Sequence, residues 1–264
     1  MVQAFFTGAN GLRAQQYNID VIANNVANID TFGYKQSRLD FKDALYNRMI
    51  NPVDNGAHQN LQHGTGVLAL QNNRIFHQGA AITTGRTLDF MLEGDGFFVV
   101  EDYDGDLLFT RGGSFDLSVE PDGAYLVTPD GRYVLDQNYE RIVFTDANGG
   151  PLMITDNPGL LDVAPDGSIY VDGADTGVKM GVAAFINPVG LEVAGDNFFR
   201  VSENSGEPEE LFGANVVHRT LEASNVDYAN EMTRLIRAQR AYQMASRCIN
   251  TADQMAGLAN TVRG

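Results

Sequence analysis

The 264-residue sequence predicts an α+β protein in which N- and C-terminal helices form a coiled-coil-like assembly domain around a central antiparallel β domain, a meander of hairpins. Apolar or small residues recur every seven positions at both ends, a spacing typical of helices that pack against helices. Between the ends, short β-branched and aromatic runs are bounded by Asp-Gly turns, as in hairpins. Residues 51–217 hold 26 acidic and seven basic residues, whereas both ends are nearly neutral and free to pack.

The first expected helix covers residues 3 to about 28. Its apolar seam has heptad spacing and consists of Phe5, Leu12, Ile19, Ile22 and Val26. The polar residues Asn24, Asn25 and Asn28 close this helix, and Gly33 offers the left-handed conformation that often follows a helix end. The helix would be roughly 39 Å long at 1.5 Å per residue, and it cannot bury a narrow seam by itself.

The second expected helix extends to about Val262. Ser224 to Asp227 resembles a capping box with Ser224 as the N-cap. The heptad row that follows consists of Tyr228, Leu235, Tyr242 and Ile249, with alanines three residues after several of them. We therefore expect one assembly domain from residues 1–35 plus 218–264, an extended polar connector over 36–75, and the β domain over 76–217. Within the connector, 51–66 has no period and is expected to be a loop.

The central region contains short runs that are typical of strands. These runs are 97–100, 107–110, 124–127, 132–135 and 168–171. Pro-Asp-Gly occurs at 121–123, 129–131 and 165–167, and each triplet suits a turn in which glycine supplies a positive φ. The segment Gly94–Phe98 is echoed by Gly195–Phe199, which predicts two turn-plus-strand entries side by side in the same β domain.

Composition and motifs exclude several classes of function. The net charge of −16 and the pI near 4.5 argue against binding to nucleic acid or anionic membranes. The sequence contains no run of 18 apolar residues, so we expect no membrane-spanning segment. Asp102, Asp104 and Asp106 alternate like calcium ligands, but an EF-hand loop would need glycine at Leu107. The histidines lack zinc-site spacing, and no catalytic or cofactor motif is present. Cys248 is expected to be a buried or half-buried packing residue. We therefore predict no enzyme, no metal and no cofactor.

Two long terminal segments carry a family resemblance. Residues 11–35, GLRAQQYNIDVIANNVANIDTFGYK, resemble the N-terminal motif of the flagellar basal-body rod and hook family, and residues 221–255 are similar to its C-terminal motif. The central segments 94–98 and 110–115 also match, so the likeness covers most of the chain. The positions that carry the terminal motifs are Asn24, Asn25, Ala27, Asn28, Gly33, Ser224, Asn225, Gln239, Arg240, Ala241 and Tyr242.

The resemblance implies a structural subunit that assembles with copies of itself into a hollow helical rod. Such a rod transmits torque to the hook and encloses the export channel, with other rod proteins, hook protein, surrounding ring proteins and the rod cap as neighbours. It implies a place in the basal body outside the cytoplasmic membrane, in the periplasmic or cell-wall zone, reached by type III export without a cleaved signal peptide. Chain length and the position of Gly64–Val67 after a polar connector favour the distal-rod type.

Other readings stay open at this point. A proximal rod protein or another rod or hook paralogue would fit, because the stretch 51–63 is somewhat short for the distal type. A surface β domain with a coiled-coil stalk would explain the composition but not both terminal motifs. An enzyme with an acidic site among the hairpin tips would explain the aspartates alone.

Overall fold

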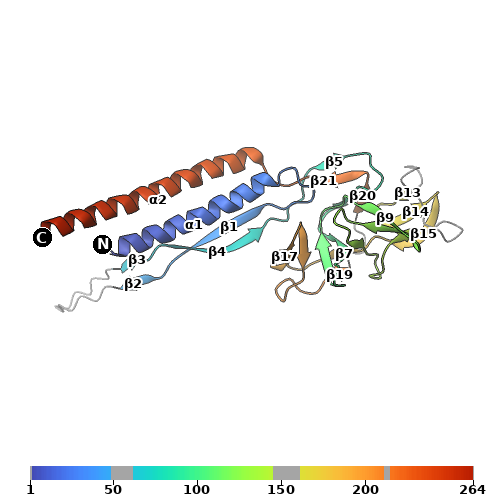
Figure 1. The fold of residues 1–264 in the computed structure, drawn as a ribbon. Helices are drawn as coiled ribbons and strands as arrows, with labels where there is room; N and C mark the ends of the chain where they lie inside the picture. The colour runs from blue at the N-terminus through green and yellow to red at the C-terminus, as the bar shows by residue number, and fades with distance from the viewer. Residues whose placement is uncertain (1, 49–61, 145–160, 211–214, 264) are drawn as a thin grey trace. The chain divides into compact units, whose positions relative to one another are not determined.

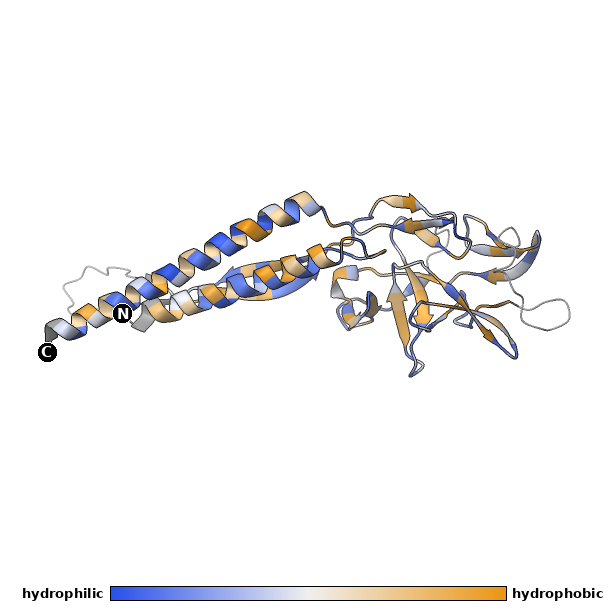
Figure 2. Cartoon of the chain, turned by 45° about the horizontal axis from the view of Figure 1, so that its top comes forward, coloured by the Kyte–Doolittle hydropathy of each residue, from blue (hydrophilic) through white to orange (hydrophobic). Residues whose placement is uncertain are grey.

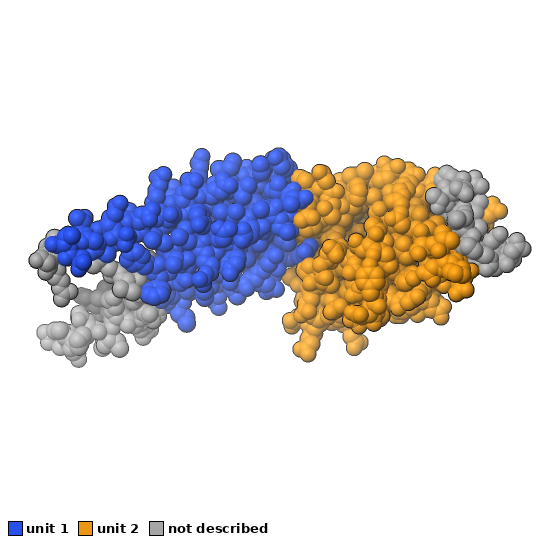
Figure 3. Space-filling view, in the orientation of Figure 1, with its two compact units in different colours: residues 1–27, 37–74, 227–264 blue, residues 28–36, 75–226 orange. Residues whose placement is uncertain are grey.

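A computed structural model describes residues 2–48, 62–144, 161–210 and 215–263. The chain divides into two compact units, which Figure 3 distinguishes by colour. The helical unit comprises residues 1–27, 37–74 and 227–264, and the β unit comprises 28–36 and 75–226. Terminal helices together with antiparallel strands confirm the α+β class (Figure 1).

The helical unit contains two helices and two strand pairs. Its elements are α1 (Val2–Ala27), β1 (Ser37–Asp43), β2 (Tyr46–Arg48), β3 (Gln62–Gly64), β4 (Val67–Arg74) and α2 (Tyr228–Arg263). Strand β1 pairs antiparallel with β4 from Ser37↔Arg74 to Asp43↔Val67, with a bulge between Asp40 and Phe41. Strand β2 pairs with β3. Helix α1 contacts α2 as well as both β1 and β4, so it is the central element of this unit.

The unit boundaries differ from the domain boundaries that the sequence suggested. Residues 36–75 were expected to form an extended connector, whereas β1 and β4 belong to the helical unit and pack against α1. Residues 28–35 and 218–226, expected with the helices, belong to the β unit. Strand β1, SRLDFKD, alternates charged and apolar residues but has only two large apolar ones, Leu39 and Phe41, so the sequence alone gives only a short strand signal there. The expected loop over 51–66 lies mostly outside the described residues.

The β unit is built almost entirely of antiparallel strands. These are β5 (Ala81–Thr83), β6 (Phe90–Glu93), β7 (Phe97–Glu101), β8 (Leu107–Thr110), β9 (Asp116–Glu120), β10 (Gly123–Val127), β11 (Tyr133–Val134), β12 (Val143–Phe144), β13 (Leu161–Val163), β14 (Ser168–Val171), β15 (Ala174–Lys179), β16 (Val182–Ala184), β17 (Glu192–Gly195), β18 (Phe198–Arg200), β19 (Glu209–Glu210), β20 (Asn215–His218) and β21 (Thr220–Glu222), with a short 3₁₀ helix at Pro188–Gly190. Ten of them form one sheet, β13–β14–β15 form a second, and β20–β6 and β21–β5 are separate pairs. All five predicted strand runs contain a strand.

Strand β7 is buried on both of its faces. Alternate side chains enter two apolar clusters: Phe98 and Val100 lie in the larger one, and Phe97 and Val99 lie in the smaller one with Phe109. Side chains alternate across a strand, so a strand covered on both faces needs a continuous apolar run, which FFVV supplies. In Figure 2 the strands of this unit are predominantly apolar, whereas polar and apolar residues alternate along α2.

The sequence echo maps onto two strands that flank a third. Phe98 of β7 and Phe198 of β18 both pair with Thr110 of β8, one on each side. The expected side-by-side arrangement is therefore wrong, because β8 follows β7 in a tight hairpin and occupies the neighbouring position. Of the three Pro-Asp-Gly turns, Gly131 and Gly167 adopt the predicted positive φ, 88° and 83°.

Candidate assembly surface at the helix pair

Helices α1 and α2 form an antiparallel pair. Near the end of α1, Asn25 reaches Glu231 at the start of α2. Near the start of α1, a Cβ added to Gly8 would lie 2.7 Å from Cγ1 of Ile249. Glycine therefore allows close approach at this crossing. With 36 residues against 26, α2 continues beyond the part that α1 covers.

The predicted seam is only partly buried within this pair. Six of its residues are half-buried: Phe5, Leu12, Ile19, Val26, Leu235 and Ile249. Ile22 is buried and packs at the centre, near Ala238 of the alanine row. Tyr228 and Tyr242 remain exposed, at 53% and 36%. Ile22 and Ile249 of the rows therefore lie at the contact between the helices, whereas Tyr228 and Tyr242 stay exposed.

Large apolar side chains are also exposed away from the seam. They are Phe6, Tyr17, Ile236, Met244, Met255 and Leu258. Met244 and Leu258 are each 67% exposed, and Cys248, expected to be at least half-buried, is exposed between them. Met244 and Cys248 lie on a helix face that α1 does not cover. Their exposure could therefore not be predicted from the hydrophobicity of the residues. Contiguous exposed apolar surface is typical of a protein–protein contact site.

A buried polar network closes the end of the helix pair. The amide of Asn25 donates through Nδ2 to the carbonyl oxygen of Ser37 at 2.8 Å and to Oε2 of Glu231 at 3.2 Å. Its Oδ1 accepts the backbone N–H of Ser37 at 2.9 Å. Glu231 is fully buried, and Arg234 donates to its Oε1 at 2.8 Å. One amide thus joins α1, β1 and α2, and each buried group of the amide has a partner.

The start of α2 corrects the predicted N-cap. Asp227, not Ser224, caps the helix: its Oδ1 accepts the backbone N–H groups of Ala229 at 2.9 Å and Asn230 at 3.3 Å. Ser224 accepts only a longer bond from Val226, at 3.4 Å. Both residue types are good caps, so the motif could not distinguish two candidates three positions apart.

Asn225 holds the strand segment before α2 in place. Its Oδ1 accepts the backbone N–H of Gln36 at 2.7 Å, and its Nδ2 donates to the carbonyl oxygens of Ile75 at 2.7 Å and His77 at 2.9 Å. Three separate chain segments of the β unit therefore meet at one side chain. An amide suits this position because it accepts one hydrogen bond and donates two at once.

Gly33 is the second motif residue with a structural explanation in the β unit. Its φ is +68°, and a Cβ would lie 2.6 Å from the backbone carbonyl carbon of Arg111. Its N–H donates to the carbonyl oxygen of Glu222 at 2.7 Å. Asn28 opens the turn before it and accepts a bond from the Thr31 hydroxyl at 3.2 Å. A side chain at position 33 would meet both backbone strain and a steric clash.

The sequence analysis missed a buried cluster of three charges. Lys35 donates through Nζ to Oε1 of Glu222 at 2.6 Å and to the carbonyl oxygen of His77 at 2.9 Å. Glu222 also accepts the N–H of Gly79 at 2.7 Å, and its Oε2 lies 3.5 Å from Nη1 of Arg111. All three charged side chains are at most 2% exposed. Burial lowers the pKa of the Lys35 ammonium below its usual value, and the Glu222 carboxylate opposes that shift.

A signal for this cluster was present in the sequence. Lys35 ends the N-terminal motif and Glu222 lies at the start of the C-terminal motif, so opposite charges occupy the inner ends of the two segments. The period of apolar residues does not reveal charged residues. Lys35 and Glu222 can be buried because their opposite charges compensate each other.

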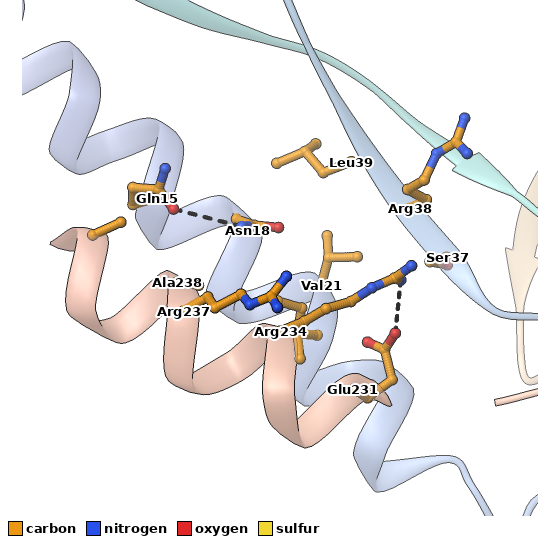
Figure 4. A pocket seen from close by; sticks show the side chains of 12 residues that line it. Gln15, Asn18, Val21, Ser37, Arg38, Leu39, Glu231, Arg234, Arg237 and Ala238 are labelled. Atoms are coloured by element: carbon orange, nitrogen blue, oxygen red, sulfur yellow. Dashed lines mark hydrogen bonds and ion pairs between the residues drawn. The ribbon is translucent and has the colours of Figure 1, made fainter. Parts of the chain in front are cut away.

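The remaining motif residues lie at the surface of the helical unit. Asn24, Ala27, Gln239 and Arg240 are exposed, and Ala241 is half-buried. Ala241 also lines a cleft of about 410 Å³ between α1, α2 and β1. Figure 4 shows Arg234 and Arg237 extending from α2 beside this cleft, with the bond from Arg234 to Glu231 drawn as a dashed line. The helix pair thus combines exposed apolar residues with a basic cleft.

Among the described residues, no group of three or more His, Cys, Asp or Glu side chains is placed to hold a metal ion. None of the helices in the described part of the chain has the length and hydropathy needed to span a membrane.

Comparison with known proteins identifies the family. Three family descriptions match: "Flagella basal body rod protein" over residues 5–35, "Flagellar hook protein FlgE/F/G D1 domain" over 91–171, and "Flagellar basal body rod FlgEFG protein C-terminal" over 218–262. The chain is 35% identical to the flagellar basal-body rod protein FlgG of Borreliella burgdorferi, covering 100% of this chain and 99% of the relative. It is 37% identical to FlgG of Agrobacterium fabrum over 98% of both chains. It is 32% identical to the flagellar hook-basal body complex protein FlhP of Bacillus subtilis over 100% of both. The chain therefore belongs to the flagellar basal-body rod family of the FlgG type, and it is a structural protein of the flagellum, not an enzyme.

Proposed function

We propose that this chain is the subunit of the distal rod and that it assembles with copies of itself into a hollow helical drive shaft. The observation that carries this proposal is the helix pair, whose apolar residues at 236, 244, 255 and 258 are 51–67% exposed in the part of the chain that the structure describes. A contact between different surfaces of identical copies generates an open helical assembly when its rotation does not close a ring. Such an assembly transmits torque to the hook and encloses the export channel.

The acidic β unit suits a position on the outside of the rod. Residues 51–217 have a large excess of acidic side chains, whereas the terminal segments are nearly neutral. Like charges on the outside keep subunits soluble before assembly, and neutral helices can pack at close range. We place the rod outside the cytoplasmic membrane, in the periplasmic or cell-wall zone, and infer export by the type III route. Other rod proteins, the hook protein, ring proteins around the rod and the rod cap are the proposed neighbours.

The assembly surface can be tested with Met244→Glu. Met244 is exposed on α2, so the charge should leave the monomer folded and prevent neighbouring helices from packing. We expect unchanged circular dichroism of the purified chain, together with loss of complete rods in electron micrographs of basal bodies. Gln243→Glu adds the same charge at the adjacent exposed position and serves as the control. Normal rods in the Met244→Glu strain would contradict the assignment of this face.

Charges in the seam give a second, distinct test. Leu235 and Ile19 are half-buried between the helices, so Leu235→Asp or Ile19→Asp should separate the pair and block assembly while the β unit stays folded. Motility in such a strain would contradict the proposed role of the pair.

A proximal rod protein or another rod or hook paralogue is the second candidate, and the full-length similarity to the hook-basal body complex protein FlhP supports another paralogue. The two are distinguished by the place where the rod stops in a strain that lacks this gene. Basal bodies with a proximal rod but no distal rod would support the distal assignment. Basal bodies without any rod would support the proximal one.

A further inference from the structure

The cleft of the helical unit has an uncompensated positive charge. Three arginines line it: Arg38, Arg234 and Arg237. Arg38 pairs with Asp40 at 3.1 Å and Arg234 pairs with Glu231 at 2.8 Å. Arg237 is exposed, and within the described part of the chain it makes no hydrogen bond or ion pair. One guanidinium at the cleft is therefore free for a ligand.

The rest of the lining defines the chemistry of that ligand. Val21, Ile22, Leu39 and the two alanines at 238 and 241 give the cleft apolar walls, and Gln15 and Asn18 add amides. A guanidinium binds a carboxylate through parallel N–H groups, and it also packs against an aromatic ring. The cleft thus suits a carboxylate with an apolar or aromatic neighbour, carried on a segment narrow enough to enter about 410 Å³.

A segment of this composition is present in the β unit. The tip between β7 and β8 spans Asp102–Asp106, where Tyr103 is 71% exposed and stands between two aspartates. Asp102 binds Arg132 at 3.0 Å and Asp106 lies 3.4 Å from Arg200, so these carboxylates are engaged. Asp104 is exposed and has no partner among the described residues. It therefore presents a free carboxylate beside an exposed aromatic ring.

We propose that the cleft of one copy binds the β7–β8 tip of a second copy, with Asp104 paired to Arg237. This inference rests on the proposed self-assembly and adds a polar contact to the apolar helix packing. The apolar face alone would allow helices to slide past one another, whereas a charge pair fixes their register. The contact also uses the charge difference between the two parts of the chain, which attracts unlike surfaces of neighbouring copies.

Crosslinking tests the contact in assembled rods. A photoreactive amino acid replaces Gln15, which also lines the cleft, in the full chain with Arg237 intact, and rods are purified from cells after irradiation. We expect a product twice the size of the chain, whose crosslinked peptide contains residues 102–106. A crosslink to another helix, to a different rod protein or within one chain would overturn the proposal. Crosslinks that never join two copies would in addition contradict the self-assembly on which it rests.

Charge exchange provides the second test. Arg237→Glu and Asp104→Arg should each lower the number of complete rods per cell by at least about tenfold, because a like-charge pair replaces an attractive one. The double variant restores the attraction and should return to within about threefold of the wild type. Asp122→Arg, which changes an exposed aspartate in the turn between β9 and β10, should have no such effect. A double variant as impaired as either single one, or an equal loss in the control, would overturn the pairing.

Discussion

The buried charge cluster of the β unit makes an asymmetric prediction about stability. Glu222 binds Lys35 and the N–H of Gly79 and lies beside Arg111, so it is the anion that both buried cations share, whereas Lys35 binds Glu222 and the carbonyl oxygen of His77. Lys35→Met leaves one anion beside one cation. Glu222→Gln leaves two buried cations with no anion between them. Loss of the carboxylate should therefore destabilise the protein more than loss of the ammonium.

These contacts determine how much free energy of unfolding each variant should lose. Breaking a buried pair by removing one partner costs about 3–5 kcal/mol. We expect Lys35→Met to lower the free energy of unfolding by about 3 kcal/mol, since Arg111 still compensates Glu222. Glu222→Gln should lower it by about 5 kcal/mol. The double variant Lys35→Met with Glu222→Gln should cost less than the sum of both single effects, because it leaves one buried cation, Arg111, where Glu222→Gln alone leaves two. Arg38→Met, which breaks a pair that is 55% and 40% exposed, should cost less than about 1 kcal/mol.

Urea unfolding of the full chain, followed by circular dichroism, measures these differences. The sequence has no tryptophan, so tyrosine fluorescence provides the second probe. Two units can unfold separately, and the variants should shift only the transition assigned to the β unit. A cost for Lys35→Met equal to or above that for Glu222→Gln would refute the charge argument. So would costs for both variants as small as that of Arg38→Met.

Two further substitutions test local geometry by the same unfolding measurement. Gly33→Ala should cost roughly 3 kcal/mol or more, through strain at positive φ and the clash with the Arg111 backbone, whereas Gly85→Ala has the strain without the clash and should cost roughly 1 kcal/mol. Equal costs for Gly33→Ala and Gly85→Ala would show that the close approach of Gly33 to the Arg111 backbone has no role. Asp227→Ala should cost about 1 kcal/mol and weaken amide protection at the start of α2, while Ser224→Ala should leave both nearly unchanged. A larger cost for Ser224→Ala than for Asp227→Ala would instead support Ser224 as the N-cap.

The sequence was sufficient for features that depend on repetition. Heptad spacing identifies the helix pair because the period of a helix is local, and the seam residue Ile22 is indeed buried. The run Phe97–Val100 identifies a core strand for the same reason. The helix bounds also agree within a few residues, as helix ends are marked by caps and glycine.

Features that depend on partners far along the chain were not predictable in the same way. Strand β1 has few apolar residues and is a strand because β4 pairs with it, and β18 was misplaced because pairing order is decided by hairpin formation between β7 and β8. Lys35 and Glu222 are 187 positions apart, so neither residue has a local pattern that reveals its burial. Long-range polar matching leaves no period in the sequence.

The terminal motifs act first inside the chain. Within the helical unit, Asn25 binds Glu231. Within the β unit, Gly33 donates to Glu222 and the N–H of Asn225 donates to the carbonyl oxygen of Tyr34, so each of these bonds joins the N-terminal motif to the C-terminal one. A residue with all its polar groups satisfied internally has little left to offer a neighbour. Contacts between copies must then use exposed positions, such as those of α2 and of the basic cleft. Substitutions at Asn25, Gly33 or Asn225 should therefore destabilise the subunit, whereas those at Met244 or Arg237 should affect the rod alone.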